Sequence, residues 1–229
     1  MKITANKIIS IIAHDLKDPL ASLSGISGIL MENWDEFSSE EKLSIIQDIR
    51  DTSDTTLRLL SDLLDWSKKV NENSEPEKRT IDPGMEIAAI LESGTRKAKW
   101  KKTEIDNQVP SGMKLNTDIN MFAAVFRNLL ANAIKSCVKG GKISISAERA
   151  GKFCRFCIAD NGVGMTKSQI DALFKSSKQC NGKSGIQGSV SGFGLILCKD
   201  FVEILGGQLW AESEEGVGTR VFFTFPGSC

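Results

Sequence analysis

Two long runs of regularly spaced apolar residues occupy the first third of the sequence and restrict what it can fold into. Apolar side chains at three- and four-residue steps predict helices, each with one coiled-coil-like stripe. Two such helices cannot enclose a core alone, whereas two hairpins can pack as a four-helix bundle, so we expect a homodimer. The stripes consist of Ile9, Ile12, Leu16, Leu20, Leu23, Ile26 and Leu30, and of Ile46, Ile49, Ser53, Leu57, Leu60 and Leu64.

Polar segments mark the boundaries of these helices. Residues 33–40 predict a turn, and Ser38 or Ser39, with Glu41 nearby, can cap the second helix. Residues 71–80 are polar, contain a proline and show no apolar period, which predicts a linker. We therefore expect a helical domain over residues 1–70 and a second domain over residues 81–229.

The second domain mixes helical and strand patterns. Hairpins interspersed with helices predict a mixed sheet covered by helices on one face, which makes the whole chain α+β. The expected helices are Asp82–Lys97, Asp118–Val138 and Gly194–Leu205, and the expected strands are Lys142–Arg149, Lys152–Ala159, Gln208–Glu212 and Thr219–Phe225.

Charge and hydropathy exclude some classes of protein. Lys+Arg and Asp+Glu balance at 29 each, which argues against bulk nucleic-acid binding because that needs a basic surface. No apolar run approaches the ~18 residues of a membrane span, and the first ten residues do not form a signal peptide. We expect a cytoplasmic chain, either whole or as the cytoplasmic part of a larger, membrane-associated protein.

Cys154 and Cys157 form a C-x-x-C spacing, among six cysteines in total. A metal site would need a second ligand pair, and the sequence has none at ligand spacing. A redox pair would begin a helix, whereas these residues fall in an expected strand and point to opposite faces. We expect reduced, structural thiols, with a cysteine-based redox sensor as an alternative function.

His14 is the only histidine in the chain. At about 100° per residue it falls opposite the apolar stripe of its helix and faces solvent. Most lone surface histidines are idle, but Asp15 adjoins this one and could take its proton, which leaves the other ring nitrogen free as a nucleophile. Pro19, inside the helical pattern, predicts a kink just beyond His14.

Asn128, Asn132 and Lys135 are three or four residues apart and share one helix face. Asparagine is a poor helix former, so two at a four-residue step need a reason. Amide oxygens suit Mg²⁺, and Lys135 could neutralise phosphate charge. The alternative is two solvated asparagines.

Asp160, Gly162 and Gly164 follow an expected strand directly. A carboxylate there can accept a hydrogen bond from an amino group such as that of adenine, and glycines permit close approach of backbone to a ligand. The alternative is a tight turn before a helix capped by Thr166.

Gly192 and Gly194 open the last expected helix. Backbone N–H groups of a glycine-rich turn at a helix N-terminus can cradle phosphates. Residues 175–191, just before, form a long polar segment, which is typical of a lid or of disorder.

These motifs, in this order, resemble those of sensor histidine kinases over nearly the whole chain. The second helix also resembles the family at Leu63–Ser67, as does the tail Leu205–Thr219. The H box, N box, first Gly box, F box and second Gly box of that family correspond to His14–Pro19, Asn128–Lys135, Asp160–Gly164, Leu173–Lys175 and Gly192–Leu195.

The resemblance implies a dimerisation and phosphotransfer bundle, followed by an ATP-binding domain of the Hsp90/gyrase type with an α/β sandwich fold. His14 would be the phosphoacceptor and Asp15 its acid/base partner. ATP and Mg²⁺ would be the cofactors, and an Asp on a response-regulator receiver domain would take the phosphoryl group. A nucleotide-binding conformational module without phosphotransfer is the alternative.

Roles in the nucleotide site also follow from the resemblance. Asn132 would ligate Mg²⁺, supported by Asn128, and Asp160 would bind the adenine amino group. Residues 175–191 would be the ATP lid. Lys135 would lie near the phosphates, Thr219 near the adenine, and Gly162, Gly164, Gly192 and Gly194 along the nucleotide.

Two positions depart from the family pattern. Val190 stands where the family often has a glycine, which implies a difference in lid closure. Asp18 stands where many bifunctional relatives carry Thr or Asn, which position a water for dephosphorylating the partner. Because a carboxylate there would repel the acyl phosphate, we predict weak phosphatase activity.

Overall fold

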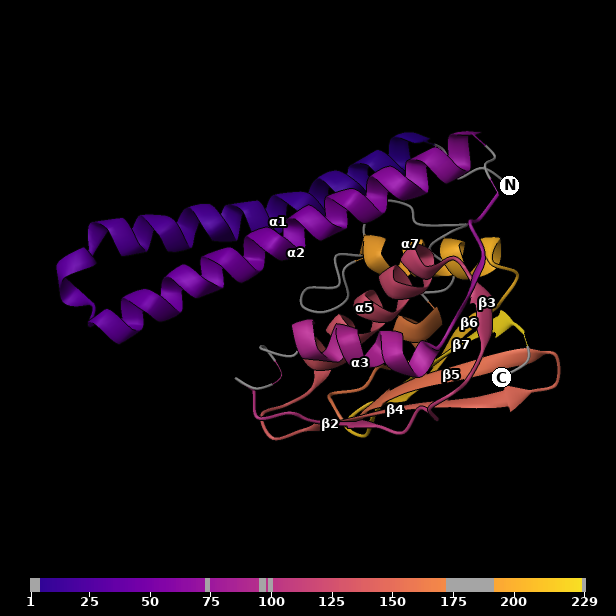
Figure 1. The fold of residues 1–229 in the computed structure, drawn as a ribbon. Helices are drawn as coiled ribbons and strands as arrows, with labels where there is room; N and C mark the ends of the chain where they lie inside the picture. Colours follow the sequence, from indigo (N-terminus) through magenta and orange to yellow (C-terminus); the bar gives the residue numbers. More distant parts are fainter. Residues whose placement is uncertain (1–4, 73–74, 95–97, 99–100, 172–191, 228–229) are drawn as a thin grey trace. The chain divides into compact units, whose positions relative to one another are not determined.

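The computed structural model describes residues 5–72, 75–94, 98, 101–171 and 192–227. Within these it does not describe the side chains of residues 5–15, 65, 68–72, 93–94, 192 and 193. The chain forms two compact units, Met1–Asn73 and Ser74–Cys229 (Figure 1).

The first unit is a helical hairpin. Helix α1 (Ala5–Glu32) and helix α2 (Ser39–Glu72) are joined by a short 3₁₀ turn over Trp34–Glu36. Ser38 caps α2, because its backbone N–H donates to Glu41 Oε2 at 2.8 Å while the Glu41 N–H donates to Ser38 Oγ at 3.2 Å. Both predicted helices are confirmed, and Pro19 lies inside α1.

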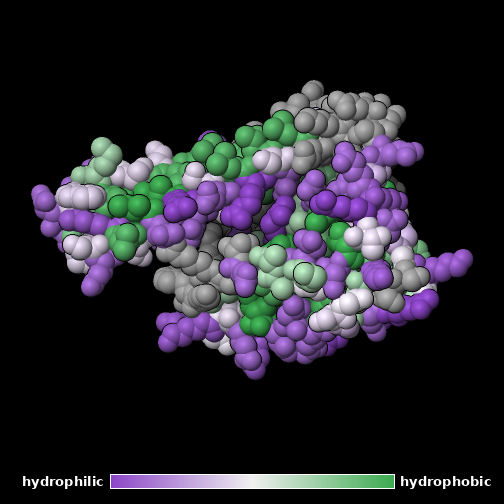
Figure 2. Space-filling view, in the orientation of Figure 1, coloured by the Kyte–Doolittle hydropathy of each residue, from purple (hydrophilic) through white to green (hydrophobic). Residues whose placement is uncertain are grey.

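Part of the apolar stripe of the hairpin is open to solvent within the single chain. The exposed fractions of Leu20, Leu57 and Leu64 are 54%, 59% and 54%. Figure 2 shows hydrophobic residues gathered along the hairpin. Contiguous exposed apolar surface of this kind is typical of protein–protein contacts.

The second unit contains a five-stranded mixed sheet in the order β2-β4-β5-β7-β6. Strand β2 (Glu104–Asn107) runs parallel to β4 (Lys142–Ala150), and the other pairs are antiparallel. These other strands are β5 (Phe153–Asp160), β6 (Leu209–Glu214) and β7 (Gly218–Pro226). The mixed sheet predicted from the sequence is confirmed.

Three helices cover one face of this sheet: α3 (Pro83–Gly94), α5 (Ile119–Ser136) and α7 (Gly192–Ile204) (Figure 1). The core lies between α5 and the sheet. There the ring of Phe122 on α5 packs edge-on to Phe156 on β5 at a centroid distance of 5.6 Å. Phe223 and Phe225 on β7 join the same cluster of rings. This packing fixes the position of α5 relative to β5, and both elements contribute side chains to the pocket.

Three short strands were not predicted from the sequence. Besides β2 these are β1 (Arg79–Ile81) and β3 (Leu115–Thr117), which pair antiparallel with each other. The predicted linker over residues 71–80 therefore overlaps the end of α2 and the start of β1. Among the described helices, none is both long and apolar enough to cross a membrane.

The two cysteines of the C-x-x-C spacing lie on opposite faces of β5, as predicted: Cys154 is fully buried and Cys157 is partly exposed. Cys157 is a free thiol, so the pair does not close on itself. Cys154, however, is disulfide-bonded. The prediction that all the cysteines are reduced was therefore wrong for Cys154, because strand position alone carries no information about a distant partner.

Candidate functional site

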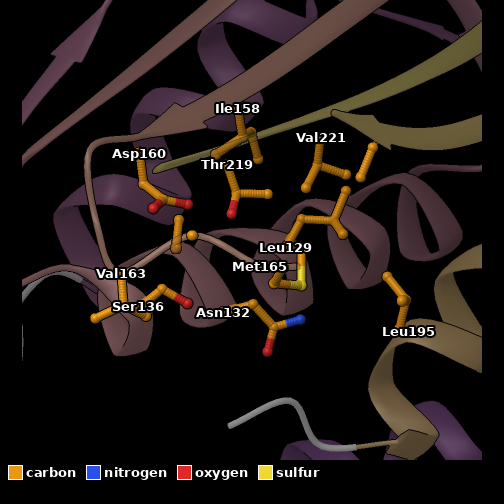
Figure 3. A pocket seen from close by; sticks show the side chains of 13 residues that line it. Leu129, Asn132, Ser136, Ile158, Asp160, Val163, Met165, Leu195, Thr219 and Val221 are labelled. Atoms are coloured by element: carbon orange, nitrogen blue, oxygen red, sulfur yellow. The ribbon is translucent and has the colours of Figure 1, made fainter. Parts of the chain in front are cut away.

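A pocket lies between α5, the adjoining ends of β5 and β7, and the loop that follows β5 (Figure 3). Four polar side chains reach it. Asp160 ends β5, Thr219 lies near the start of β7, and Asn132 and Ser136 are four residues apart on one face of α5. The packing of α5 on the sheet therefore brings together four of the residues singled out from the sequence, which are Asn132, Asp160, Gly164 and Thr219.

Asp160 lies directly opposite Thr219 in the β5–β7 pairing. Its carboxylate accepts hydrogen bonds from the Gly162 N–H at 2.9 Å and from the backbone N–H of Thr219. Burial raises the pKa of Asp160 above its ordinary value, and these two hydrogen bonds oppose the rise. A half-buried carboxylate of this kind is a strong acceptor for a donor group placed in the pocket.

Asn132 presents its amide at the α5 side of the same pocket (Figure 3). It is half-buried, and no described residue forms a hydrogen bond with its side chain. An unused amide oxygen beside a pocket fits Mg²⁺, which prefers oxygen ligands and completes its shell with phosphates and water. No three His, Cys, Asp or Glu side chains cluster as a metal site in the described part of the chain.

Contacts at both ends of α5 stabilise the helix that carries Asn132. Asp118 caps the helix, since its carboxylate accepts from the N–H groups of Asn120 and Met121. At the other end, the Lys101 ammonium donates to the carbonyl oxygens of Ile134, Lys135 and Cys137, each at 3.0 Å. A cation at the C-terminal end of a helix is favourable for the helix dipole.

Gly162 and Gly164 are required by contacts within the protein. A Cβ on Gly162 would lie 2.3 Å from the carbonyl oxygen of Ser136, and one on Gly164, where φ is +64°, would lie 1.9 Å from that of Glu214. The loop is thus pressed between the end of α5 and the β6–β7 hairpin. Of the two, only Gly164 lines the pocket. The predicted close approach to a ligand stays a prediction for both.

Asn128 is not among the residues that line the pocket. Its amide donates to the Ala124 carbonyl at 2.9 Å, and a Cβ on Gly194 would lie 2.8 Å from its Oδ1. Asn128 therefore lies where α5 meets α7, and Gly194 is small because that contact is close.

Other predicted site residues lie elsewhere. Lys135 is exposed in the last turn of α5, and Gly192 is the first residue of α7. His14 and Asp15 lie on α1 in the first unit, and their side chains are outside the described residues. The predicted lid at residues 175–191 and the F box at residues 173–175 are also outside them.

The apolar lining of the pocket was not recognised from the sequence as part of a site. It consists of Leu129, Ala133, Ile158, Val163, Met165, Leu195, Ala211 and Val221. Such residues carry no signal of their own, because their side chains are typical of any core. Ser136 did carry one, since it continues the face of Asn128 and Asn132 by one further helical turn.

Two family models match the chain. The model described as the His Kinase A (phospho-acceptor) domain matches residues 4–72, and the one described as the histidine kinase-, DNA gyrase B- and HSP90-like ATPase matches residues 117–228. The sensor protein kinase WalK of Staphylococcus epidermidis is 28% identical over 219 residues, which cover 94% of this chain and 35% of the relative. WalK of Staphylococcus aureus is 29% identical over 220 residues, with the same coverage. The chain thus spans about a third of the length of these relatives.

Solved structures share the fold. The Acinetobacter baumannii histidine kinase AdeS has a TM-score of 0.65 at 18% identity, covering 94% of this chain and 98% of that one. The histidine kinase ThkA in complex with the response regulator protein TrrA has a TM-score of 0.60 at 18% identity, covering 97% and 61%. Full-length ShkA in complex with AMPPNP has a TM-score of 0.64 at 19% identity, covering 99% and 47%.

Proposed function

This chain belongs to the histidine kinase family, with a phospho-acceptor domain followed by an ATPase domain, and on that premise we propose that it uses ATP to phosphorylate its own His14. The phosphoryl group then passes to an Asp of a response-regulator receiver domain. The observation that carries the proposal is the pocket between α5 and the sheet. It sets the carboxylate of Asp160 at one side and, at the other, the amide of Asn132, which forms no hydrogen bond with the described part of the chain.

The base of a nucleotide would occupy the inner part of the pocket. Apolar side chains such as Ile158 and Met165 would contact the base, while Asp160 would accept a hydrogen bond from the adenine amino group. The phosphates would then lie toward Asn132 and the start of α7, because the first N–H groups of a helix, which begins here at Gly192, have no partner within the helix. Lys135, in the last turn of α5, would add positive charge there.

The transfer step depends on positioning and charge neutralisation. Asn132 would hold Mg²⁺ through its amide oxygen, with Asn128 supporting it, and the ion would neutralise phosphate charge. Asp15 accepts a proton from one ring nitrogen of His14. The other nitrogen attacks the γ-phosphorus, the bond to the bridging oxygen breaks, and ADP leaves.

The working form is a homodimer. Leu20, Leu57 and Leu64 leave apolar surface exposed on the hairpin, and a second hairpin would cover it to complete a four-helix bundle. The receiver domain would dock on that bundle around His14. ThkA, which shares the fold, was solved in complex with a response regulator protein. ATP as the phosphoryl donor places the reaction in the cytoplasm.

A radiolabelling experiment separates this proposal from a module that binds nucleotide without transfer. Incubation with γ-labelled ATP and Mg²⁺ should leave acid-labile, base-stable label on the chain. ADP binding without any label would favour the module instead. The redox alternative is tested by alkylating Cys157, which should leave autophosphorylation unchanged because that thiol lies away from the pocket lining.

A further inference from the structure

Three residues form one row across neighbouring strands at the pocket. Ser213 on β6 is paired with Thr219 on β7, and Thr219 is paired with Asp160 on β5. Residues directly opposite each other share a face of the sheet, so all three point to the side covered by α5. Thr219 and Asp160 line the pocket, whereas Ser213 lies behind Thr219.

The hydroxyl of Ser213 has three close partners. The N–H of Met165 donates to Ser213 Oγ at 2.8 Å, Ser213 Oγ donates to the carbonyl oxygen of Gly218 at 2.8 Å, and Thr219 Oγ1 lies 2.8 Å away. A serine hydroxyl has one hydrogen to donate. The Gly218 carbonyl can only accept, so it takes that hydrogen. The contact between the two hydroxyls must then use the hydrogen of Thr219.

The direction of these hydrogen bonds determines whether the Thr219 hydroxyl can donate to a ligand or only accept from it. With its hydrogen directed at Ser213, Thr219 Oγ1 presents only lone pairs to the pocket, and the neighbouring carboxylate of Asp160 is an acceptor as well. We propose that Ser213 is a specificity-determining residue: it orients the Thr219 hydroxyl as an acceptor and so selects a base that carries an amino group over one that carries a carbonyl at the same place.

This inference rests on the proposed function, because it concerns the base of the nucleotide in the same pocket. A 6-aminopurine would place N–H donors against the two acceptors, whereas a 6-oxopurine would place a third acceptor there. Without Ser213 the Thr219 hydroxyl can rotate and donate to the 6-oxo group. The preference for the 6-aminopurine over the 6-oxopurine should then become smaller, even though Asp160 is unchanged.

The test compares the affinities of ADP and IDP, which differ at the 6-position and cannot support transfer, by calorimetric titration of the whole chain. The unaltered chain should favour ADP. Ser213→Ala should narrow the ratio of the two dissociation constants about fivefold, the worth of one net hydrogen bond. Ser213→Thr, which keeps the hydroxyl, should preserve the ratio. Ser144→Ala, an exposed serine on β4, is the matched control and should also preserve it.

A double variant shows whether Ser213 acts through Thr219. In a Thr219→Val background, Ser213→Ala should not change the ADP/IDP ratio further. If Ser213→Ala does not fold, Ser213→Cys, with its weaker donor and acceptor, replaces it under the same criterion.

The inference is overturned if Ser213→Ala weakens ADP and IDP equally, since a purely structural loosening of Met165 would do that. It is also overturned if the ratio changes equally with and without the Thr219 hydroxyl. Failure of the unaltered chain to bind either nucleotide would instead refute the proposed function itself.

Discussion

The backbone N–H of Thr219 donates a hydrogen bond to the carboxylate of Asp160 across the β5–β7 pair. Together with the Gly162 N–H it only partly offsets the cost of burial, because the pKa of Asp160 is still raised. Ionisation of Asp160 therefore lowers the stability of the nucleotide-free chain. Such a cost is typical of functional residues.

We predict that Asp160→Asn lowers ADP affinity about 10- to 100-fold, since a hydrogen bond to a charged acceptor is lost. It should leave the melting temperature of the nucleotide-free chain unchanged or higher. The folded chain has the higher pKa at this site, so its ionisation lowers the free energy of unfolding as the pH rises through the window above the ordinary pKa of Asp. In Asp160→Asn this fall in the free energy of unfolding with rising pH should be absent. Calorimetric titration and thermal melts across pH measure both effects, with the exposed Asp106→Asn as control.

Gly164→Ala should disrupt the pocket through the backbone. The residue has φ +64°, and its new Cβ would lie 1.9 Å from the Glu214 carbonyl oxygen. Gly151 has nearly the same φ, +66°, but a Cβ there meets nothing within 4 Å. Gly151→Ala should therefore cost about 1 kcal/mol of unfolding free energy and leave ADP binding intact. Gly164→Ala should cost more and abolish binding; equal effects of the two changes would refute the close-packing argument.

Lys101→Met removes the ammonium that binds three carbonyl groups at the end of α5. We predict a loss of about 1–2 kcal/mol in unfolding free energy, reduced from the full value of the contacts because Lys101 is partly exposed. Urea denaturation measures the loss. Lys139→Met, an exposed lysine in the following turn, is the control and should change the unfolding free energy by less than about 0.5 kcal/mol.

Asp18 is exposed on α1, four residues after His14. A carboxylate there would repel an acyl phosphate and an attacking hydroxide, so the unaltered chain should dephosphorylate its partner slowly. Asp18→Thr should accelerate the loss of phosphoryl from a phosphorylated receiver domain by about tenfold, by positioning water. Asp48→Asn, an exposed change on α2, should not. Rapid loss with the unaltered chain would show that the carboxylate is no obstacle.

Long periodic elements could be predicted from the sequence, because the apolar period of an amphipathic helix or a paired strand is a local property. The helix that carries Asn132 and the strand that ends at Asp160 are examples. Strand β2 could not be predicted, since only Ile105 is even partly buried there and its partner strand begins at Lys142, far along the chain.

Within the site, charged and amide side chains could be recognised, whereas the roles of small residues could not. The sequence did not predict that Gly164 also packs closely against the backbone of the β6–β7 hairpin. Ser213 gave no signal at all, because a serine in a strand is unremarkable until its three hydrogen-bond partners are known.

Autophosphorylation of two variants with γ-labelled ATP tests the central claim most directly. His14→Gln should bind ADP with unchanged affinity and take up no acid-labile label, since the acceptor nitrogen is gone. Asn132→Ala should keep His14 yet label at least about 100-fold more slowly than the unaltered chain. Labelling of His14→Gln equal to that of the unaltered chain would contradict the account.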